Sequence, residues 1–171
     1  MHPASVSSHP PMPVVTYFLH AIDGIAGVLG RDVPPIVQIE TLRSQPTGTL
    51  GRELVNSLDR DQLDPFTTGP RRKQLHDSIH ILAGYGTDPV GEAEVQAFLL
   101  GACCHPLHLI LSLGLVNIIR RRCPEISLPQ LHQRLHRAYQ RGWQSSFHPN
   151  TWRPEDQWHW PLTQVRSQFG L

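Results

Sequence analysis

The chain has 171 residues, a net charge of +1 and only 17% charged residues. This length suits one domain with a hydrophobic core of its own, and the small net charge gives no sign of a strongly basic nucleic-acid-binding protein. Cys103, Cys104 and Cys123 make a poor disulfide framework, because they are odd in number and two are adjacent. Such cysteines indicate a reducing compartment, so we expect a cytoplasmic protein, either free or peripheral on the inner face of a membrane. We expect no signal peptide, because no Lys or Arg precedes Arg31, and no lipid anchor.

Proline, glycine and the spacing of apolar residues divide the chain into helices. Residues 1–13 are rich in Pro, Ser and His and are expected to form a disordered tail, followed by a single domain over residues 14–171. The predicted helices cover residues 14–30, 36–43, 50–58, 71–83, 89–104, 107–119, 127–141 and 162–169. No segment alternates long enough to predict a strand, so we expect an all-α, single-domain helical bundle.

Two histidines lie in the helix predicted over residues 71–83. His76 and His80 are four residues apart, which places both imidazoles on one helix face, one turn apart. Gly84 is a good C-cap for that helix, and Asp88-Pro89 is a good start for the next one. Glu92 follows that start by about one turn, so a hairpin between the two helices brings its carboxylate to the depth of His80. The sequence predicts a metal site between two consecutive helices.

The ligand types indicate the kind of metal. Two neutral imidazoles with one or two carboxylates suit Zn²⁺, Fe²⁺ or Mn²⁺ better than Ca²⁺, and so few ligands leave open positions, as in catalytic sites. Asp77 lies in the same arc and either ligates the ion or orients a histidine. The alternative is that His76 and His80 are ordinary surface or capping histidines and that Glu92 is an acid favoured by the helix dipole.

The ligand pattern resembles a known signature. His-Asp-x-x-His followed by eleven residues and Glu, which here is formed by His76, Asp77, His80 and Glu92, resembles that of the coenzyme Q biosynthesis protein four family. Three further stretches resemble the same family, namely QPTGTLGR (45–52), LAGYGT (82–87) and PLTQVRSQFGL (161–171). The resemblance covers roughly residues 40–171, although residues 100–125 depart from the family's pattern.

The resemblance implies an all-helical fold and one divalent metal, which would be zinc by likeness to the family, with iron, manganese or magnesium as alternatives. The implied metal ligands and catalytic residues are His76, Asp77, His80 and Glu92. It also implies a prenylated quinone precursor or another isoprenoid lipid as ligand, and other quinone biosynthesis proteins as partners. The family is associated with removal of the ring carboxyl at carbon one of the precursor and its replacement by oxygen.

Residues 97–119 form the most apolar stretch of the chain, although Pro106 argues against a single membrane span. They form either a buried helix pair or, together with residues 14–29, an apolar groove that leads to the metal, with Phe98 and Leu99 against the lipid. Arg71 and Arg72 either bind an anionic head group or are simply exposed. The run 120–122 (RRR) either meets head groups at a membrane surface or ends a solvated helix. Exposed apolar helices would also permit a homodimer.

A second metal site is a weaker prediction. Cys103, Cys104, His105 and His108 are close in sequence, but adjacent cysteines are poor joint ligands and free cysteines are usually small buried hydrophobes.

Two other clusters are expected to be structural. His132 and His136 are one turn apart without a nearby carboxylate and should form a polar helix face. Trp152, Trp158 and Trp160 could anchor the chain at a membrane, but we expect them to pack the C-terminal segment onto the domain.

Three functions are compatible with these patterns. The first is a metal enzyme, a decarboxylase that also oxygenates a prenylated aromatic acid, and a redox reaction would favour iron or manganese over zinc. The second is a lipid-binding organiser that presents an intermediate to other enzymes. The third is a metal-dependent phosphohydrolase of the His-Asp type, for which His20 and Asp156 are the only candidates for the further ligands.

Overall fold

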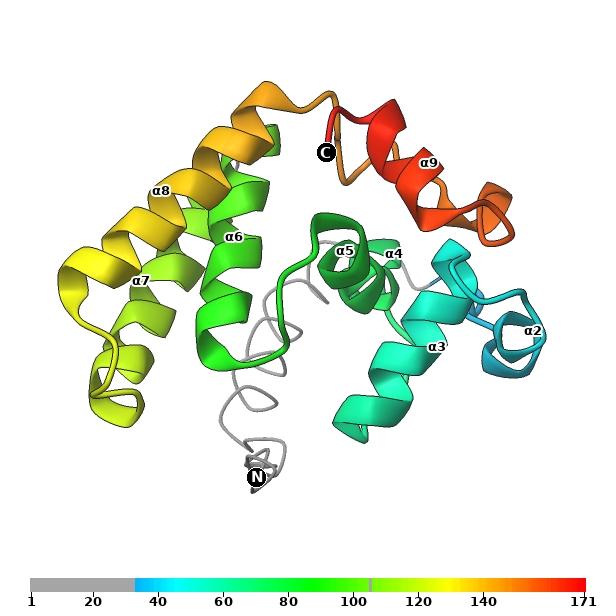
Figure 1. Cartoon of the computed structure of the whole chain (residues 1–171), viewed down its shortest axis with the longest axis horizontal. Coiled ribbons are helices and arrows are strands. Elements are labelled where there is room, and N and C mark those ends of the chain that lie inside the picture. The colour runs from blue at the N-terminus through cyan, green and yellow to red at the C-terminus, as the bar shows by residue number, and fades with distance from the viewer. Residues whose placement is uncertain (1–32, 105) are drawn as a thin grey trace, which may run out of the picture.

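The computed structural model describes residues 33–104 and 106–171, and these residues are helical, without a strand. The predicted tail and the predicted helix over residues 14–30 lie outside the described residues, as does His105. Figure 1 shows the described helices, which are α2 (Ile39–Arg43), α3 (Leu50–Asp61), α4 (Arg71–Gln74), α5 (His76–Ala83), α6 (Pro89–Cys103), α7 (Pro106–Arg122), α8 (Leu128–Gln144), the 3-10 helix η1 (Pro154–Asp156) and α9 (Leu162–Gln168). The predicted all-α fold class is confirmed.

The helix predicted over residues 71–83 is divided in two. The helix is interrupted by a turn at Leu75, with φ −92° and ψ −2°, which separates α4 from α5. The buried side chain of Gln74 beside the break accepts from the Ile36 N–H and donates to the Val33 and Gly69 carbonyls. The same bonds tie Val33 and Ile36 to Gln74, and α2 begins at Ile39 rather than at residue 36.

Two boundaries in this region were predicted correctly. Gly84 ends α5 in the left-handed conformation, with φ +76°, which costs glycine little. Asp88 begins α6 by accepting hydrogen bonds from the Val90 and Gly91 N–H groups, and Pro89 occupies the first helical position. The turn between α5 and α6 therefore has the predicted ends.

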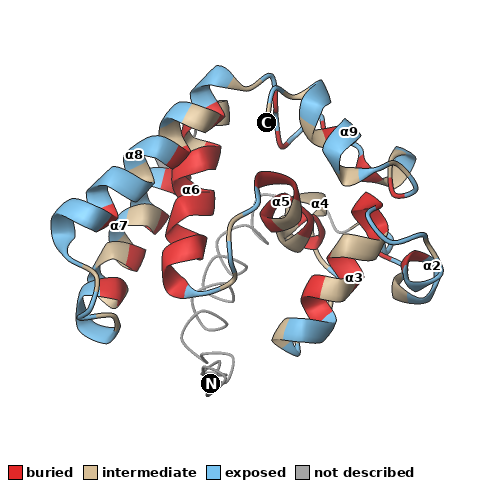
Figure 2. Ribbon diagram, in the orientation of Figure 1, coloured by how far each residue is buried: buried red, intermediate tan, exposed pale blue. Residues whose placement is uncertain are grey.

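Helix α6 lies at the centre of the molecule. It packs against α7 and α8 on one side and against α5 on the other, and Figure 2 shows buried residues around almost all of it. Two glycines allow the close crossing with α8. A Cβ on Gly101 would lie 2.2 Å from the Tyr139 carbonyl oxygen, and one on Gly142 would lie 2.0 Å from the Phe98 carbonyl oxygen.

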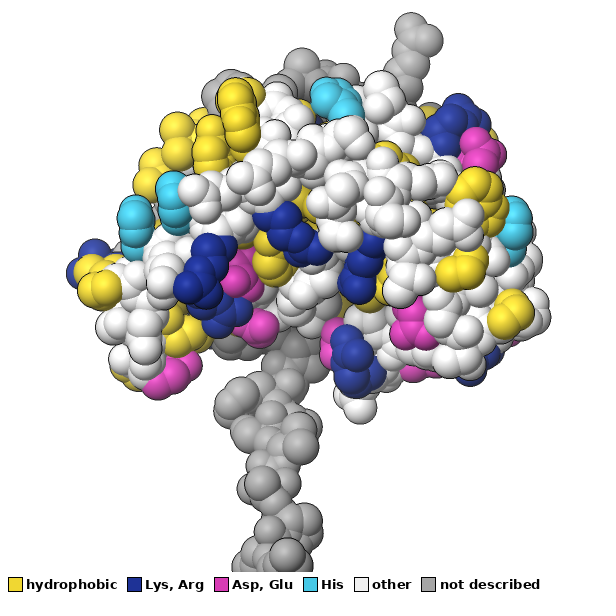
Figure 3. Space-filling view, turned by 45° about the horizontal axis from the view of Figure 1, so that its top comes forward, with side chains coloured by type: hydrophobic (Ala, Val, Ile, Leu, Met, Phe, Trp, Pro, Cys, Tyr) yellow, Lys and Arg dark blue, Asp and Glu magenta, His cyan; other side chains and the backbone are white. Residues whose placement is uncertain are grey.

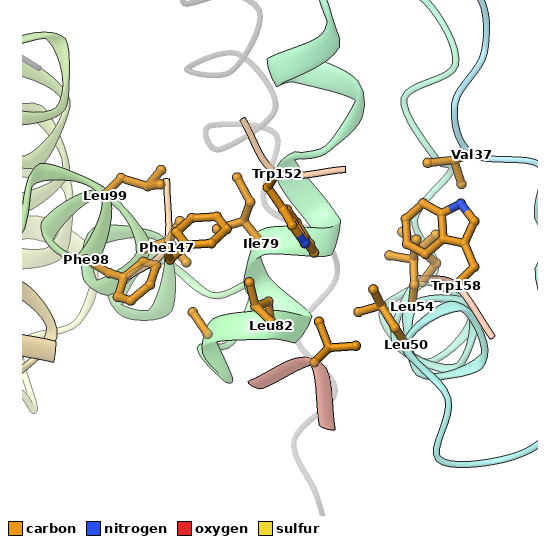
Figure 4. Close-up of a cluster of buried hydrophobic side chains, with 14 of the residues drawn as sticks. Val37, Leu50, Leu54, Ile79, Leu82, Phe98, Leu99, Phe147, Trp152 and Trp158 are labelled. Atoms are coloured by element: carbon orange, nitrogen blue, oxygen red, sulfur yellow. The ribbon is translucent and has the colours of Figure 1, made fainter. Parts of the chain in front are cut away.

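The main core joins distant parts of the chain. In Figure 4, Phe98 and Phe147 face Ile79 and Leu82 from α5, while Trp152 lies between these residues and the α3 side. Trp158 packs beside Leu50 and Leu54 of α3. Trp152 and Trp158 are both buried and Trp160 is partly buried against the same core. The prediction that these tryptophans pack the C-terminal segment onto the domain is thus confirmed.

Helix α7 has an apolar outer face. Leu109, Ile110 and Leu113 are 50%, 65% and 63% exposed, and Figure 3 shows hydrophobic side chains gathered on the side of the molecule formed by α7 and α8. Among the described helices, none has the length and hydropathy needed to cross a bilayer. The predicted apolar groove, which involves residues 14–29, falls largely outside the described residues and stays a prediction.

Candidate metal centre

Three side chains from α5 and α6 meet at the turn between these helices. The Nε2 atoms of His76 and His80 are 3.1 Å apart, and Glu92 Oε2 lies 3.2 Å from the first and 3.0 Å from the second. Glu92 and His80 are 2% exposed, whereas His76 lies at the edge, with 13% of its side chain exposed. The predicted hairpin therefore does bring two imidazoles and one carboxylate together.

The triangle of ligand atoms fits a small divalent cation. Bonds of about 2.0–2.1 Å, as for Zn²⁺ to nitrogen or oxygen, place neighbouring ligand atoms about 2.8–3.4 Å apart in octahedral or tetrahedral geometry. The edges of the triangle, 3.0, 3.1 and 3.2 Å, lie within this range. One ion could touch all three atoms without a rearrangement of the helices. Three protein ligands would leave at least one position for water or substrate.

The turn between the helices orients His80. Its Nδ1 lies 2.9 Å from the Gly86 carbonyl oxygen, which can only accept a hydrogen bond. The Nδ1 therefore carries the proton in the neutral ring, and the lone pair of Nε2 points toward Glu92 and His76. Gly91 makes this contact feasible, because a Cβ there would lie 2.2 Å from the same Gly86 oxygen.

The charges of the three groups are coupled. Burial by itself would lower the pKa of His76, but the charge and hydrogen bond of Glu92, aided by Asp77, outweigh it and raise this pKa to about 9. Burial opposes ionisation of Glu92, yet the two histidines hold the pKa of its carboxyl well below the ordinary value. The metal-free site at neutral pH thus contains an anionic Glu92 against a protonated His76, and a divalent ion would replace that proton.

No protein-family model matches the chain, but curated proteins and a solved structure are similar to it. The mouse ubiquinone biosynthesis protein COQ4 homolog, mitochondrial, is 26% identical over 159 residues, covering 79% of this chain and 54% of the mouse protein. The Xenopus tropicalis protein of the same name is 32% identical over 97 residues, covering 43% of this chain and 35% of that protein. The chain thus spans about half the length of the mouse relative.

A solved structure has the same fold. The crystal structure of a "putative ubiquinone biosynthesis protein" from Nostoc punctiforme superposes with a TM-score of 0.69 at 19% identity, covering 92% of this chain and 79% of that one. The resemblance to the coenzyme Q biosynthesis protein four family is confirmed. The animal relatives are named as mitochondrial proteins, and a cytoplasmic location for this chain stays a prediction.

Asp77, the fourth acidic or histidine member of the family-like signature, lies beside the triangle. Its carboxylate is not among the ligand atoms that gather within 4.8 Å of one another in the described residues. Burial raises the pKa of Asp77, and the charges of His76 and His80 oppose that rise, so the carboxylate lies within their electrostatic reach. This placement suits a residue that tunes the histidines, which is one of the two roles predicted for it.

The residues predicted to contact a lipid have other partners. Arg71 donates two hydrogen bonds to the Glu155 carboxylate, each 2.7 Å long, and a third to the Trp152 carbonyl. Phe98 and Leu99 are 0% and 2% exposed and belong to the core. The predicted head-group or lipid contacts of these three residues are therefore not supported by their surroundings. Arg72 instead contacts the ring of His108.

Several of the weaker site candidates that the structure describes are exposed or have partners of their own. Among the described residues, Cys103 donates to the Leu99 carbonyl, and Cys104 is exposed. Asp156 pairs with Arg153. His20, the other residue considered for a phosphohydrolase, lies outside the described residues. The rings of His132 and His136 stack 6.2 Å apart on the exposed face of α8, as a polar face would.

One neighbour of the ligands, Gln96, was not predicted from the sequence. The Gln96 side chain donates a 3.0 Å hydrogen bond from Nε2 to Oε1 of Glu92, the carboxylate oxygen that points away from the histidines. A sequence signal was available, because residues four apart lie on one helix face and a polar residue at that spacing from a ligand is a natural partner for it. Its contact with His108 of α7 could not be inferred in that way.

Proposed function

We propose that this chain acts in ubiquinone-type quinone biosynthesis as a protein that holds one divalent metal ion with His76, His80 and Glu92. The triangle formed by their three ligand atoms carries the proposal, because its edges of 3.0–3.2 Å match those around a small divalent ion. The names of the curated relatives support the pathway. Zinc, by family likeness, or iron, manganese or magnesium would fill the site.

The substrate we propose is an aromatic acid that carries a prenyl chain, and the reaction is replacement of its carboxyl at ring carbon one by a hydroxyl. The bond between the ring and the carboxyl carbon breaks and CO₂ leaves. Dioxygen supplies the new ring oxygen, and its second atom leaves as water with two electrons and two protons from an external reductant. A divalent ion with open positions would supply a Lewis acid and, if it is iron or manganese, a redox centre.

The residues of the chain have separate roles in this proposal. His80 is fixed by the Gly86 carbonyl and Glu92 is fixed by Gln96, so both are oriented in advance. His76 lies at the exposed edge of the triangle, where the substrate carboxylate would enter. The Asp77 carboxyl lies within electrostatic reach of both histidines and would strengthen them as ligands of a cation.

A second candidate function is that of a lipid-binding organiser for other quinone biosynthesis proteins. The exposed apolar side chains of Leu109, Ile110 and Leu113 favour it, because an exposed patch of this kind usually contacts a partner or a lipid. In this role the metal would hold the polar head of the intermediate without turnover.

One experiment separates the two functions. Purified protein loaded separately with zinc, iron or manganese is incubated with a short-chain prenylated hydroxybenzoate, a reductant and isotopically labelled dioxygen, and the products are examined by mass spectrometry. Loss of CO₂ with gain of one labelled oxygen, absent in Glu92→Gln, supports the enzyme. Binding of the substrate without turnover under all conditions supports the organiser instead.

A further inference from the structure

A chain of hydrogen bonds between buried side chains leads away from Glu92 on the side opposite the histidines. Glu92 Oε1 accepts from Gln96 Nε2 at 3.0 Å, and Gln96 Oε1 lies 2.7 Å from Nδ1 of His108. Nε2 of His108 in turn contacts the Arg72 guanidinium. These hydrogen bonds thus join α4, α6 and α7. Three of the side chains are almost fully buried, since Glu92, Gln96 and His108 are only 2%, 3% and 2% exposed.

The hydrogen bonds can run in only one direction, because the two ends are chemically fixed. A guanidinium only donates and an ionised carboxylate only accepts. Arg72 must donate to Nε2 of His108, so the His108 proton lies on Nδ1 and is donated to the Gln96 carbonyl oxygen. That contact leaves the Gln96 amide nitrogen to donate to Glu92. A reversed Gln96 amide would set oxygen against oxygen at one end and two donors against each other at the other end.

The direction of these hydrogen bonds gives the two carboxylate oxygens of Glu92 different partners. Its Oε1 is held by Gln96, while Oε2 faces the two histidine nitrogens. We propose that Gln96, His108 and Arg72 are positioning residues that hold Glu92 as a one-oxygen metal ligand. This inference rests on the proposed metal site and adds three residues outside the family-like signature to it. Outer partners of this kind typically change metal affinity 10–100-fold.

The burial of these hydrogen-bonded side chains indicates a role other than packing. Buried polar side chains are costly unless all their groups are satisfied, and an apolar residue at position 96 would suit a helix that is buried on nearly all sides. Glu94, the other buried acid on α6, faces away from this chain and pairs with Arg134 of α8 at 2.7 and 2.8 Å. It therefore provides a matched control on the same helix.

The test compares metal affinity in four variants. Metal-free wild type, Gln96→Leu, His108→Leu, His108→Asn and Glu94→Leu are titrated with Co²⁺, whose visible absorption reports coordination number, and circular dichroism verifies folding. We expect Gln96→Leu and His108→Leu to bind Co²⁺ about 10–100-fold more weakly. The Gln96→Leu spectrum should also change, because the freed Oε1 can join the metal. His108→Asn keeps a donor near the Nδ1 position and should restore most of the affinity, while Glu94→Leu should retain it.

Two results would overturn the inference, and they differ in what else they affect. If wild type binds Co²⁺ and both leucine variants at positions 96 and 108 match Glu94→Leu in affinity and spectrum, the positioning role is wrong and the metal site stands. If wild type binds no Co²⁺, the proposed metal function fails together with the inference. Should Gln96→Leu not fold, the comparison of His108→Leu with His108→Asn decides alone, and equal affinities in that pair overturn the proposal.

Discussion

The ionisation of His76 depends on the carboxylate beside it. Glu92 raises the pKa of His76 from 6.5 to about 9 against the effect of burial. The folded protein without metal therefore binds this proton more tightly than the unfolded chain does. The stabilisation of the folded state by protonation of His76 is fully present below pH 6.5 and is lost as the pH rises through about 9.

Metal binding must displace the same proton. We expect the apparent affinity for a divalent ion to rise by about tenfold per pH unit toward the His76 pKa of about 9 and then to level off. Calorimetric titrations in buffers of different ionisation enthalpy would count the protons released. An affinity independent of pH between 6.5 and 9, with no proton release, would contradict the coupling between His76 and Glu92.

Asp77 and Glu92 are both acids of the predicted signature, but only Glu92 joins the triangle. We expect Asp77→Asn to weaken metal binding by about 10–100-fold, as loss of an outer partner does, and Glu92→Gln to weaken it far more, because a ligand is lost. Competition with a chelating dye measures both affinities. If Asp77→Asn removes binding as completely as Glu92→Gln, Asp77 is a direct ligand.

At the scale of the elements, close packing of the Gly86 carbonyl against Gly91 of α6 determines the orientation of the His80 side chain. Gly91→Ala would force the Gly86 carbonyl away from α6, since the new Cβ would lie 2.2 Å from its oxygen. We expect a loss of about 1–3 kcal/mol in the free energy of unfolding and weaker metal binding, because His80 loses its partner. Urea denaturation and metal titration give the two values.

Gly101→Ala is the control for that substitution. It places a Cβ 2.2 Å from the Tyr139 carbonyl oxygen, at the crossing with α8 near the other end of α6. We expect a similar loss of stability with metal affinity retained. Equal losses of metal affinity in Gly91→Ala and Gly101→Ala would show that the Gly86 contact has no special effect on the site.

The hairpin between α5 and α6 could be predicted because its signals are local. Gly84 and Asp88-Pro89 fix the ends of two neighbouring helices, and the 3.6-residue period then sets the facing residues. The break at Leu75 was not predictable in this way. It accompanies hydrogen bonds from Gln74 to residues 33, 36 and 69, and contacts between distant segments leave no periodic signal.

The surroundings of the α6 side chains were also not predictable, because distant segments of the chain form them. Apolar residues at positions 98 and 99 are compatible with either a lipid groove or a core. The structure buries both, and Phe147 from beyond α8 packs against Phe98 with ring centroids 5.6 Å apart. His108 likewise finds its partners on α4 and α6, and spacing within its own helix could not reveal them.

At the scale of the whole molecule, Phe147 joins α6 to the C-terminal segment within the main core. Its ring lies against Phe98, Trp152 and Phe169 at centroid distances of 5.4–5.6 Å. We expect Phe147→Ala to lower the free energy of unfolding by about 3–5 kcal/mol, as measured by urea denaturation. A loss below about 1 kcal/mol would mean that the C-terminal segment does not depend on this contact.

The central claim is that His76, His80 and Glu92 hold one metal ion, and elemental analysis of the untagged protein tests it most directly. Wild type, His80→Ala and His136→Ala are compared after equal exposure to zinc, iron or manganese. His136 belongs to the exposed stacked pair on α8 and serves as the matched histidine control. We predict about one equivalent of metal in wild type and His136→Ala and almost none in His80→Ala. Equal metal content in all three, or loss of metal in His136→Ala alone, would contradict the account.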